Sequence, residues 1–135
     1  MKYEFTIHAP PKGKERPRIG KGTTYTPKAT KDYEKLVQDE YALQCGHRFA
    51  DDVMLGMTVM AWYEIPKSTN KKNREKMLWN IIRPTKKPDI DNILKLIADA
   101  LNGIAYRDDA QIVQAHIFKG YSDNPRVEVE IEVVE

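Results

Sequence analysis

The sequence contains a single cysteine, Cys45, among its 135 residues. One thiol excludes an intrachain disulfide and any metal or redox site that is built on a pair of cysteines. The three histidines, His8, His47 and His116, lie far apart and lack the spacing of a zinc-binding motif. A disulfide scaffold and a CxxC site are therefore excluded, and a zinc site is not expected.

Long hydrophobic runs are also missing. No apolar stretch approaches the roughly 18 residues that a membrane-spanning helix needs, and the first four residues, Met1 to Glu4, lack the apolar segment of a secretory signal peptide. We therefore expect a soluble intracellular protein with no membrane partner.

The chain has almost no excess of one charge, because 22 basic residues and 20 acidic ones leave a net charge of +2. The charge is nevertheless segregated along the chain. Residues 66–87 hold eight basic residues and one acid, residues 10–35 hold eight basic residues and three acids, and acids dominate residues 88–109 and 121–135. Basic segments attract a polyanion. The alternative interpretation is an ordinary solvated surface.

With 41% hydrophobic and 31% charged residues, residues 1–135 have enough apolar material for a single domain with one core. Apolar alternation and apolar runs predict strands at residues 2–9, 53–65, 111–118 and 126–134. Capping residues and helical periodicity predict helices at residues 30–44, beginning at Thr30, at residues 68–79, beginning at Ser68, and from Asp91 to Asn102-Gly103. Residues 12–28 are expected to form a long basic loop or irregular arm. This order of elements predicts an α+β fold with a mixed β-sheet packed against helices.

A dense group of carboxylates follows the second basic segment. Asp89 and Asp91 are two positions apart, so both side chains point to the same side if the segment is extended. Lys95 follows Asp91 by four residues, one turn along a helix and on the same face. The chain then reverses and returns with Asp108-Asp109, which a turn of this length brings beside the first pair.

Carboxylates that converge repel one another unless a cation neutralises them. Mg²⁺ prefers oxygen ligands and retains positions for water and phosphate oxygens, which suits hydrolysis of a phosphodiester in a polyanion. The alternatives are structural. Asp91 is an adequate helix cap, Asp89 and Asp108-Asp109 fit ordinary turns, and Asp91, Lys95 and Asp99 fit a ladder of surface ion pairs.

Residues Lys87 to Val113 resemble the RusA-type Holliday junction resolvases, which are small homodimeric endodeoxyribonucleases common in prophages. The shared motifs are D-x-D-N-x-x-K at residues 89–95, D-A-L at residues 99–101 and D-D-A-Q at residues 108–111. The resemblance implies that Asp89, Asp91 and Asp109 are essential carboxylates that bind metal and that Asp108 is an auxiliary acid. It also implies that Lys95 is the base or a cation that contacts phosphate.

From this resemblance we expect an enzyme that uses Mg²⁺ or Mn²⁺ to make paired symmetric cuts in four-way DNA junctions during recombination and repair. It would act as a homodimer in the cytoplasm of a bacterial or phage-infected cell. The basic segments supply the expected DNA contacts, which are Lys12, Lys14, Arg16, Arg18, Lys21, Lys71, Lys72, Arg74, Lys76, Lys86 and Lys87.

Two other functions compete with this hypothesis. A non-catalytic nucleic-acid-binding module would use the same basic segments and would keep the aspartates as caps and turns. A transferase that holds a nucleotide diphosphate through the DxD motif is disfavoured, because the chain has no glycine-rich phosphate loop and little length for a second substrate domain.

Overall fold

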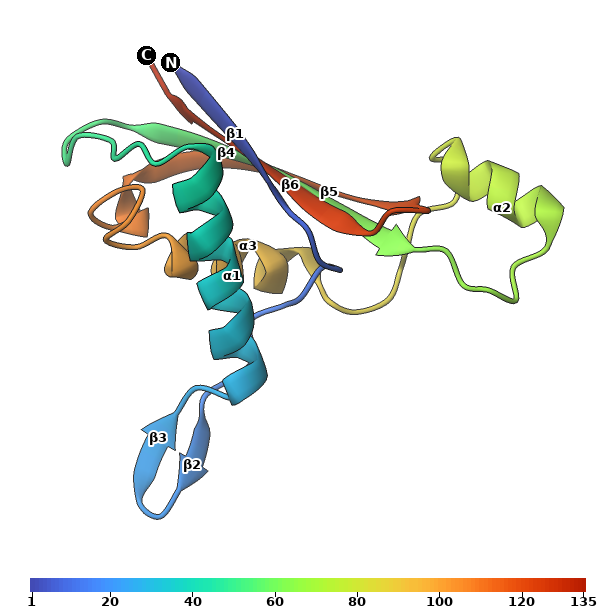
Figure 1. Cartoon of the computed structure of the whole chain (residues 1–135), viewed down its shortest axis with the longest axis horizontal. Coiled ribbons are helices and arrows are strands. Elements are labelled where there is room, and N and C mark those ends of the chain that lie inside the picture. The colour runs from blue at the N-terminus through green and yellow to red at the C-terminus, as the bar shows by residue number, and fades with distance from the viewer.

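A computed structural model describes all residues from 1 to 135. Its main sheet has four strands, β1 (Lys2–Ile7), β4 (Leu55–Glu64), β5 (Ile112–Ser122) and β6 (Arg126–Val133), in the order β1-β6-β4-β5. Strands β4 and β5 are parallel, whereas β6 is antiparallel to both β1 and β4. The predicted α+β fold with a mixed sheet is confirmed (Figure 1).

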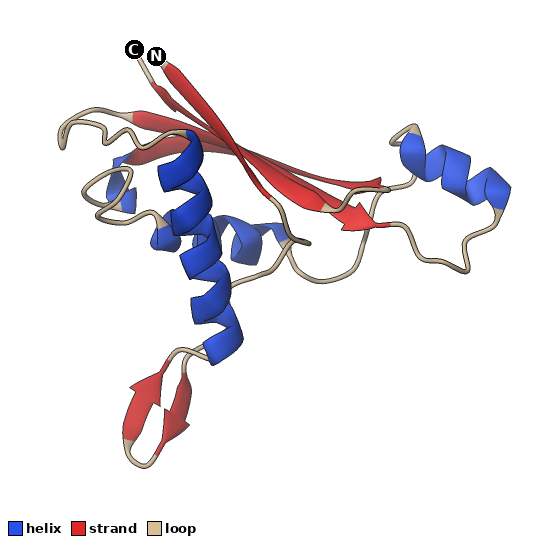
Figure 2. Cartoon of the chain, viewed as in Figure 1, coloured by secondary structure: helices blue, strands red, loops and turns tan.

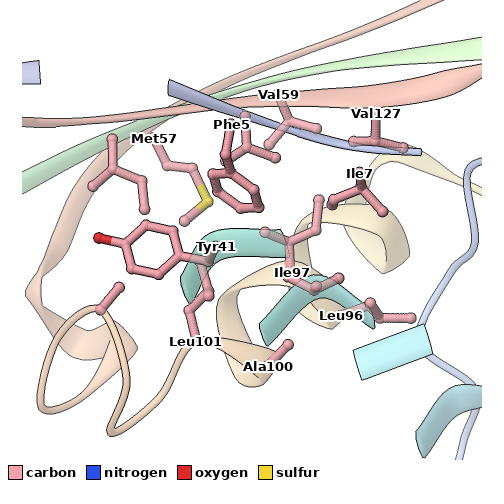
Figure 3. Packing of buried hydrophobic residues seen from close by; sticks show 14 of the residues in the cluster. Phe5, Ile7, Tyr41, Met57, Val59, Leu96, Ile97, Ala100, Leu101 and Val127 are labelled. Carbon is pink, nitrogen blue, oxygen red and sulfur yellow. The ribbon is translucent and has the colours of Figure 1, made fainter. Parts of the chain in front are cut away.

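Two helices, α1 (Lys28–Gln44) and α3 (Ile90–Ala100), cover one face of this sheet (Figure 2). The sheet contributes alternate residues to the core, such as Phe5 and Ile7 from β1 and Val127 from β6. Helix α3 contributes Leu96 and Ile97, which are fully buried (Figure 3). The core therefore lies between the sheet and the two helices.

The other face of the sheet has no helix over it (Figure 1). On β6 the strand period places Glu128, Glu130 and Glu132 on this face, opposite the buried valines and isoleucine. The alternation predicted for residues 126–134 thus has the expected physical meaning, with one covered face and one open, acidic face.

The basic arm is more regular than predicted. The composition of residues 12–28 predicts an irregular segment, but they contain a short hairpin of β2 (Arg18–Gly20) and β3 (Thr23–Tyr25). Lys21 and Gly22 form its two-residue turn, and both have positive φ, at 49° and 81°. Turns of that kind match the twist of a hairpin.

All three predicted helix starts were wrong by one to three residues. Helix α1 begins after Pro27, and Thr30 is buried instead, with its hydroxyl donating to Glu15. Helix α2 (Lys71–Leu78) is capped by Asn70, whose side chain accepts from the Asn73 amide, and α3 is preceded by Asp89. Capping depends on backbone geometry as well as on residue type, so more than one polar residue near a helix start fits the sequence pattern.

Strand β5 is longer than predicted. It continues past Phe118 to Ser122, because all of β4 up to Glu64 lies beside it. Helix α2 stands away from the rest of the molecule and has no buried residue, and the Arg74–Asp123 ion pair ties it to the turn between β5 and β6 (Figure 1). None of the helices combines the length and the apolar composition that crossing a membrane requires.

The close contact between Gly120 and Trp62 generates a test of the β4–β5 pairing. A Cβ atom at Gly120 would lie 2.6 Å from Cζ3 of the Trp62 ring. We expect Gly120→Ala to lower the free energy of unfolding by about 1–3 kcal/mol, because the ring must move. Urea unfolding measures this change. His116→Ala, at an exposed position of the same strand, is the control and should change stability by less than about 0.5 kcal/mol. Equal stability of both variants would contradict the tight packing.

Candidate functional site

Helix α3 carries most of the predicted catalytic residues and is held firmly in place. Ile93, Leu96 and Ile97 are buried on its inner side. Asp89 occupies the N-cap position, yet its carboxylate makes no capping hydrogen bond. The side chain of Asp89 is exposed and is not used to complete the helix.

Asp89 and Asp91 do not share one environment. The expectation that both carboxylates point the same way assumed an extended segment, but Asp91 lies in the first turn of α3. Asp89 lines a cavity of about 680 Å³ between α3 and the basic arm. Asp91 lines a separate hollow of about 420 Å³ between α3 and the start of β5.

This second hollow brings together three of the four predicted catalytic residues. Asp91 and Lys95 come from α3, and Asp109 comes from the 3₁₀ turn η1 (Asp109–Gln111) that precedes β5. The rest of the lining comes mainly from the start of β5. The chain thus returns after α3 as predicted and Asp109 lines one hollow with Asp91 and Lys95, but Asp89, beside which it was also expected, lines the other cavity.

Asp109 lies in an unfavourable environment for a negative charge. Partial burial raises the pKa of its carboxyl group, and the neighbouring carboxylates of Asp108 and Asp99 raise this pKa further through hydrogen bonding and charge repulsion. A bound cation would relieve this repulsion.

Asp108 has a structural role in the turn. Its side chain accepts a hydrogen bond from the Ala110 amide, while the Gln111 side chain accepts from the Asp108 amide, which together form a capping box. The predicted auxiliary acid is therefore engaged in shaping the turn that presents Asp109.

The four predicted metal ligands do not converge on one point. No group of three or more histidine, cysteine, aspartate or glutamate side chains has an arrangement that could hold a metal ion. Asp91 and Asp109, which line one hollow, nevertheless offer only oxygen donors, and a bound cation would offset the repulsion around Asp109. Such donors suit a hard divalent cation such as Mg²⁺ rather than zinc.

Asp99 is a member of the site that was not among the predicted site residues. Its Oδ2 atom lies 3.7 Å from Lys95 Nζ and 3.6 Å from Lys14 Nζ. Asp99 also lies beside Asp109. The i,i+4 spacing from Lys95 could have identified Asp99 from the sequence. The contact between Asp99 and Lys14 could not be predicted in this way, because it joins residues that are 85 positions apart.

Lys14 joins the basic arm to both helices. Its Nζ lies 3.1 Å from Glu34 on α1 in addition to its contact with Asp99, and its backbone amide donates to Asn92 O at 2.8 Å. Gly13 packs so closely on α3 that a Cβ atom there would lie 3.0 Å from Asn92 Cβ. The base of the arm is thus fixed against the start of α3.

Some of the predicted DNA contacts pair with acidic residues of this chain, whereas others form no ion pair. Lys14 is only 16% exposed and pairs internally, Lys12 and Arg18 lie close to Glu15, and Arg74 pairs with Asp123. Others are exposed and form no ion pair, namely Arg16, Lys21, Lys71, Lys72, Lys86 and Lys87. Arg16 and Lys87 line the large cavity together with Asp89.

The raised pKa of Asp109 generates a prediction about stability. The carboxyl group of Asp109 binds a proton more tightly in the folded protein than in the unfolded chain, whose pKa is about 4, so protonation stabilises the fold below that pH. This contribution is lost as the pH rises through the higher pKa of the folded protein. At pH 7 in EDTA we therefore expect Asp109→Asn to raise the melting temperature by about 2 °C, after allowance for solvent screening. The gain should vanish near pH 3.5. Thermal unfolding of Asp52→Asn, an exposed site, is the control, and an unchanged melting temperature for Asp109→Asn at pH 7 would contradict the repulsion.

Comparison with known proteins agrees with the Asp-rich motif. The family described as Endodeoxyribonuclease RusA matches residues 8–132. A relative from Bacillus subtilis (strain 168), "Uncharacterized protein YqaN", is 36% identical over 140 residues, which cover 97% of this chain and 96% of that protein. Members of the family are Holliday junction endodeoxyribonucleases that hydrolyse phosphodiester bonds in branched DNA. The protein belongs to the RusA endodeoxyribonuclease family.

Proposed function

We propose that the hollow formed by Asp91, Lys95 and Asp109 is the site where this protein cleaves four-way DNA junctions in recombination and repair. The observation that supports this proposal is that α3 and the turn before β5 bring these three side chains together. The anchored arm stands next to them through the Lys14–Asp99 contact. The proposed catalytic residues are thus adjacent to the basic arm.

Asp91 and Asp109, which line one hollow, are the residues that would hold Mg²⁺ or Mn²⁺, whereas Asp89 lines the other cavity. Such an ion, when bound, activates water and offsets the charge of the scissile phosphate. The repulsion around Asp109 favours cation binding, because binding removes an unfavourable charge interaction.

Lys95 would contact a phosphate oxygen and stabilise the negative charge that grows in the transition state. Asp99 keeps the Lys95 ammonium on the helix face that carries Asp91, through the contact one turn further along. In this arrangement Asp99 is a positioning residue. Asp108 acts indirectly, because it shapes the turn that carries Asp109.

The large cavity beside Asp89 would receive the DNA backbone. It is lined only by polar residues, prolines and glycine, with Arg16, Arg18 and Lys87 among its basic side chains. Lys71 and Lys72 at the start of α2 would add a second contact with phosphates. Such contacts are tolerant of sequence and weaken with salt. A junction has two equivalent strands to cut, so the working enzyme would be a homodimer with one site in each subunit.

The first prediction from this proposal concerns Asp91. We expect Asp91→Asn to reduce the rate of junction nicking by at least about 100-fold, because the metal loses a charged ligand. Binding to the junction should survive, since removing a negative charge does not weaken attraction to DNA. A synthetic four-way junction and a matched linear duplex, each with Mg²⁺ or EDTA, provide the measurement, together with a gel-shift assay.

Asp52→Asn is the matched control and should cleave normally. Symmetric paired nicks confined to the junction and dependent on Mg²⁺ are the expected result for the unaltered protein. Binding of the junction without any metal-dependent nicking would instead favour the non-catalytic binding module and would contradict the proposal.

The basic residues of the arm, together with Lys87 just before α3, generate a separate prediction. We expect the combined change of Arg16, Lys21 and Lys87 to Ala to weaken junction binding and to reduce the slope of log K against log salt by about 0.9 for each phosphate that the variant no longer neutralises. Lys35→Ala, on the exposed side of α1, is the control and should leave the slope unchanged. Titrations at several salt concentrations give both slopes. An unaltered slope in the triple variant would exclude the arm as the DNA-binding surface.

A further inference from the structure

Helix α2 has little support within its own chain: the Arg74–Asp123 ion pair ties it to the turn between β5 and β6, and Asn80 and Arg83, which follow the helix, line a hollow on the open sheet face. The helix has eight residues and none of them is buried. Isolated helices shorter than about 12–15 residues are marginal in water, and most helical stability in proteins comes from packing. The helix is therefore expected to pack against something outside this chain.

The end of α2 exposes a group of large apolar side chains. Leu78 is 50% exposed, Trp79 is 79% exposed and Ile81 is 71% exposed. They lie within four residues of one another, so one short segment at the end of the helix exposes three large apolar side chains. An apolar surface of this kind on a charged protein indicates an interface with another macromolecule. Phosphates would not bury these side chains, so the end of the helix is better suited to a protein surface than to DNA.

The open face of the main sheet is the second unpaired surface. The register places Met60 of β4 beside Phe118 of β5, and these side chains are 36% and 48% exposed. Trp62 lies on the same face, where its indole donates to Glu128. Two hollows, of about 400 Å³ and about 260 Å³, are both lined by Met60 on this face, and Asn80 and Arg83 of the same chain also line the smaller one.

The two surfaces are complementary in charge. Lys76 and Arg83 flank the apolar end of α2. Five glutamates of the strands lie on the open face, Glu4, Glu64, Glu128, Glu130 and Glu132, against three cations, Lys2, Arg126 and the nearby Arg83. An acidic face repels DNA, whereas it attracts a basic helix. Two copies of α2 packed against each other would instead bring like charges together.

We propose that the apolar end of α2 docks on the open sheet face of a second copy of this chain. A two-fold axis makes the contact reciprocal, so each subunit gives one helix and receives one. This inference rests on the homodimer of the proposed function and identifies the surfaces that form it. Lys71 and Lys72, at the opposite end of α2, remain outside the contact and free for phosphates.

Sedimentation equilibrium of three variants tests the contact from both sides. We expect Trp79→Glu and Phe118→Glu each to weaken dimerisation at least tenfold, because each places a charge in a surface that the dimer buries. Leu43→Glu, which alters a leucine of α1 that is 82% exposed, is the control and should dimerise normally. Far-ultraviolet circular dichroism checks that each variant is folded, and a folded Trp79→Glu protein that dimerises like the unaltered protein would overturn the proposal.

Fluorescence provides a second test. The chain has two tryptophans, so Trp62→Phe leaves Trp79 as the only reporter, and because Trp62 lies on the open face, sedimentation equilibrium first establishes that this variant still dimerises. We expect Trp79 emission to be blue-shifted in the dimer and to shift to longer wavelength on dilution, in step with dissociation. Emission that stays red-shifted in the dimer would contradict docking, and a blue shift that occurs only when a four-way junction is added would assign Trp79 to DNA instead.

The nuclease assay separates this inference from the proposed function. Dimerisation that depends on Trp79 and Phe118 in a protein that never nicks a junction would leave the docking surface standing and overturn the proposed activity. Junction cleavage by the unaltered protein, with a dimer that is insensitive to both changes, would overturn the docking surface alone.

Discussion

The packing of α3 against α1 and the main sheet is the constraint on which the site depends. Its inner residues, Ile93, Leu96 and Ile97, are excluded from solvent, so the helix has no freedom to rotate. Its outer side must then present Asp91 and Lys95 to the hollow beside β5. The same rigidity fixes Asn92 and Asp99, to which the basic arm is attached through Lys14.

Charge is distributed over this frame in a way that the small net charge conceals. The carboxylate of Asp109 is repelled by neighbouring carboxylates, which raise the pKa of its side chain. Positive charge is held in the arm and in α2, and negative charge covers the open sheet face. A nearly neutral protein thus keeps the positive charge of the arm and of α2 apart from the carboxylates around Asp109 and from the acidic sheet face.

Sequence reasoning succeeded where the signal is local and strong. The alternation of β6 and the apolar stripe of α3 predicted both elements, and the motif from Asp89 to Gln111 predicted the family. It failed where several residues compete for one role. Thr30, Ser68 and Asp91 were all plausible helix caps, but Pro27, Asn70 and Asp89 occupy those positions, because the path of the backbone selects among neighbouring polar residues.

The sequence by itself determined most of the helices and strands, the set of candidate site residues and the basic character of two segments, since each depends on residues close together in the chain. Only the tertiary structure decided that Asp89 and Asp91 face different hollows, that Asp109 joins Lys95, and that Lys14 pairs with Asp99. These placements follow from the parallel pairing of β4 with β5 and from the docking of the arm on α3. Both are contacts between parts of the chain that are far apart in sequence, so neither produces a periodic pattern of residues from which it could be predicted.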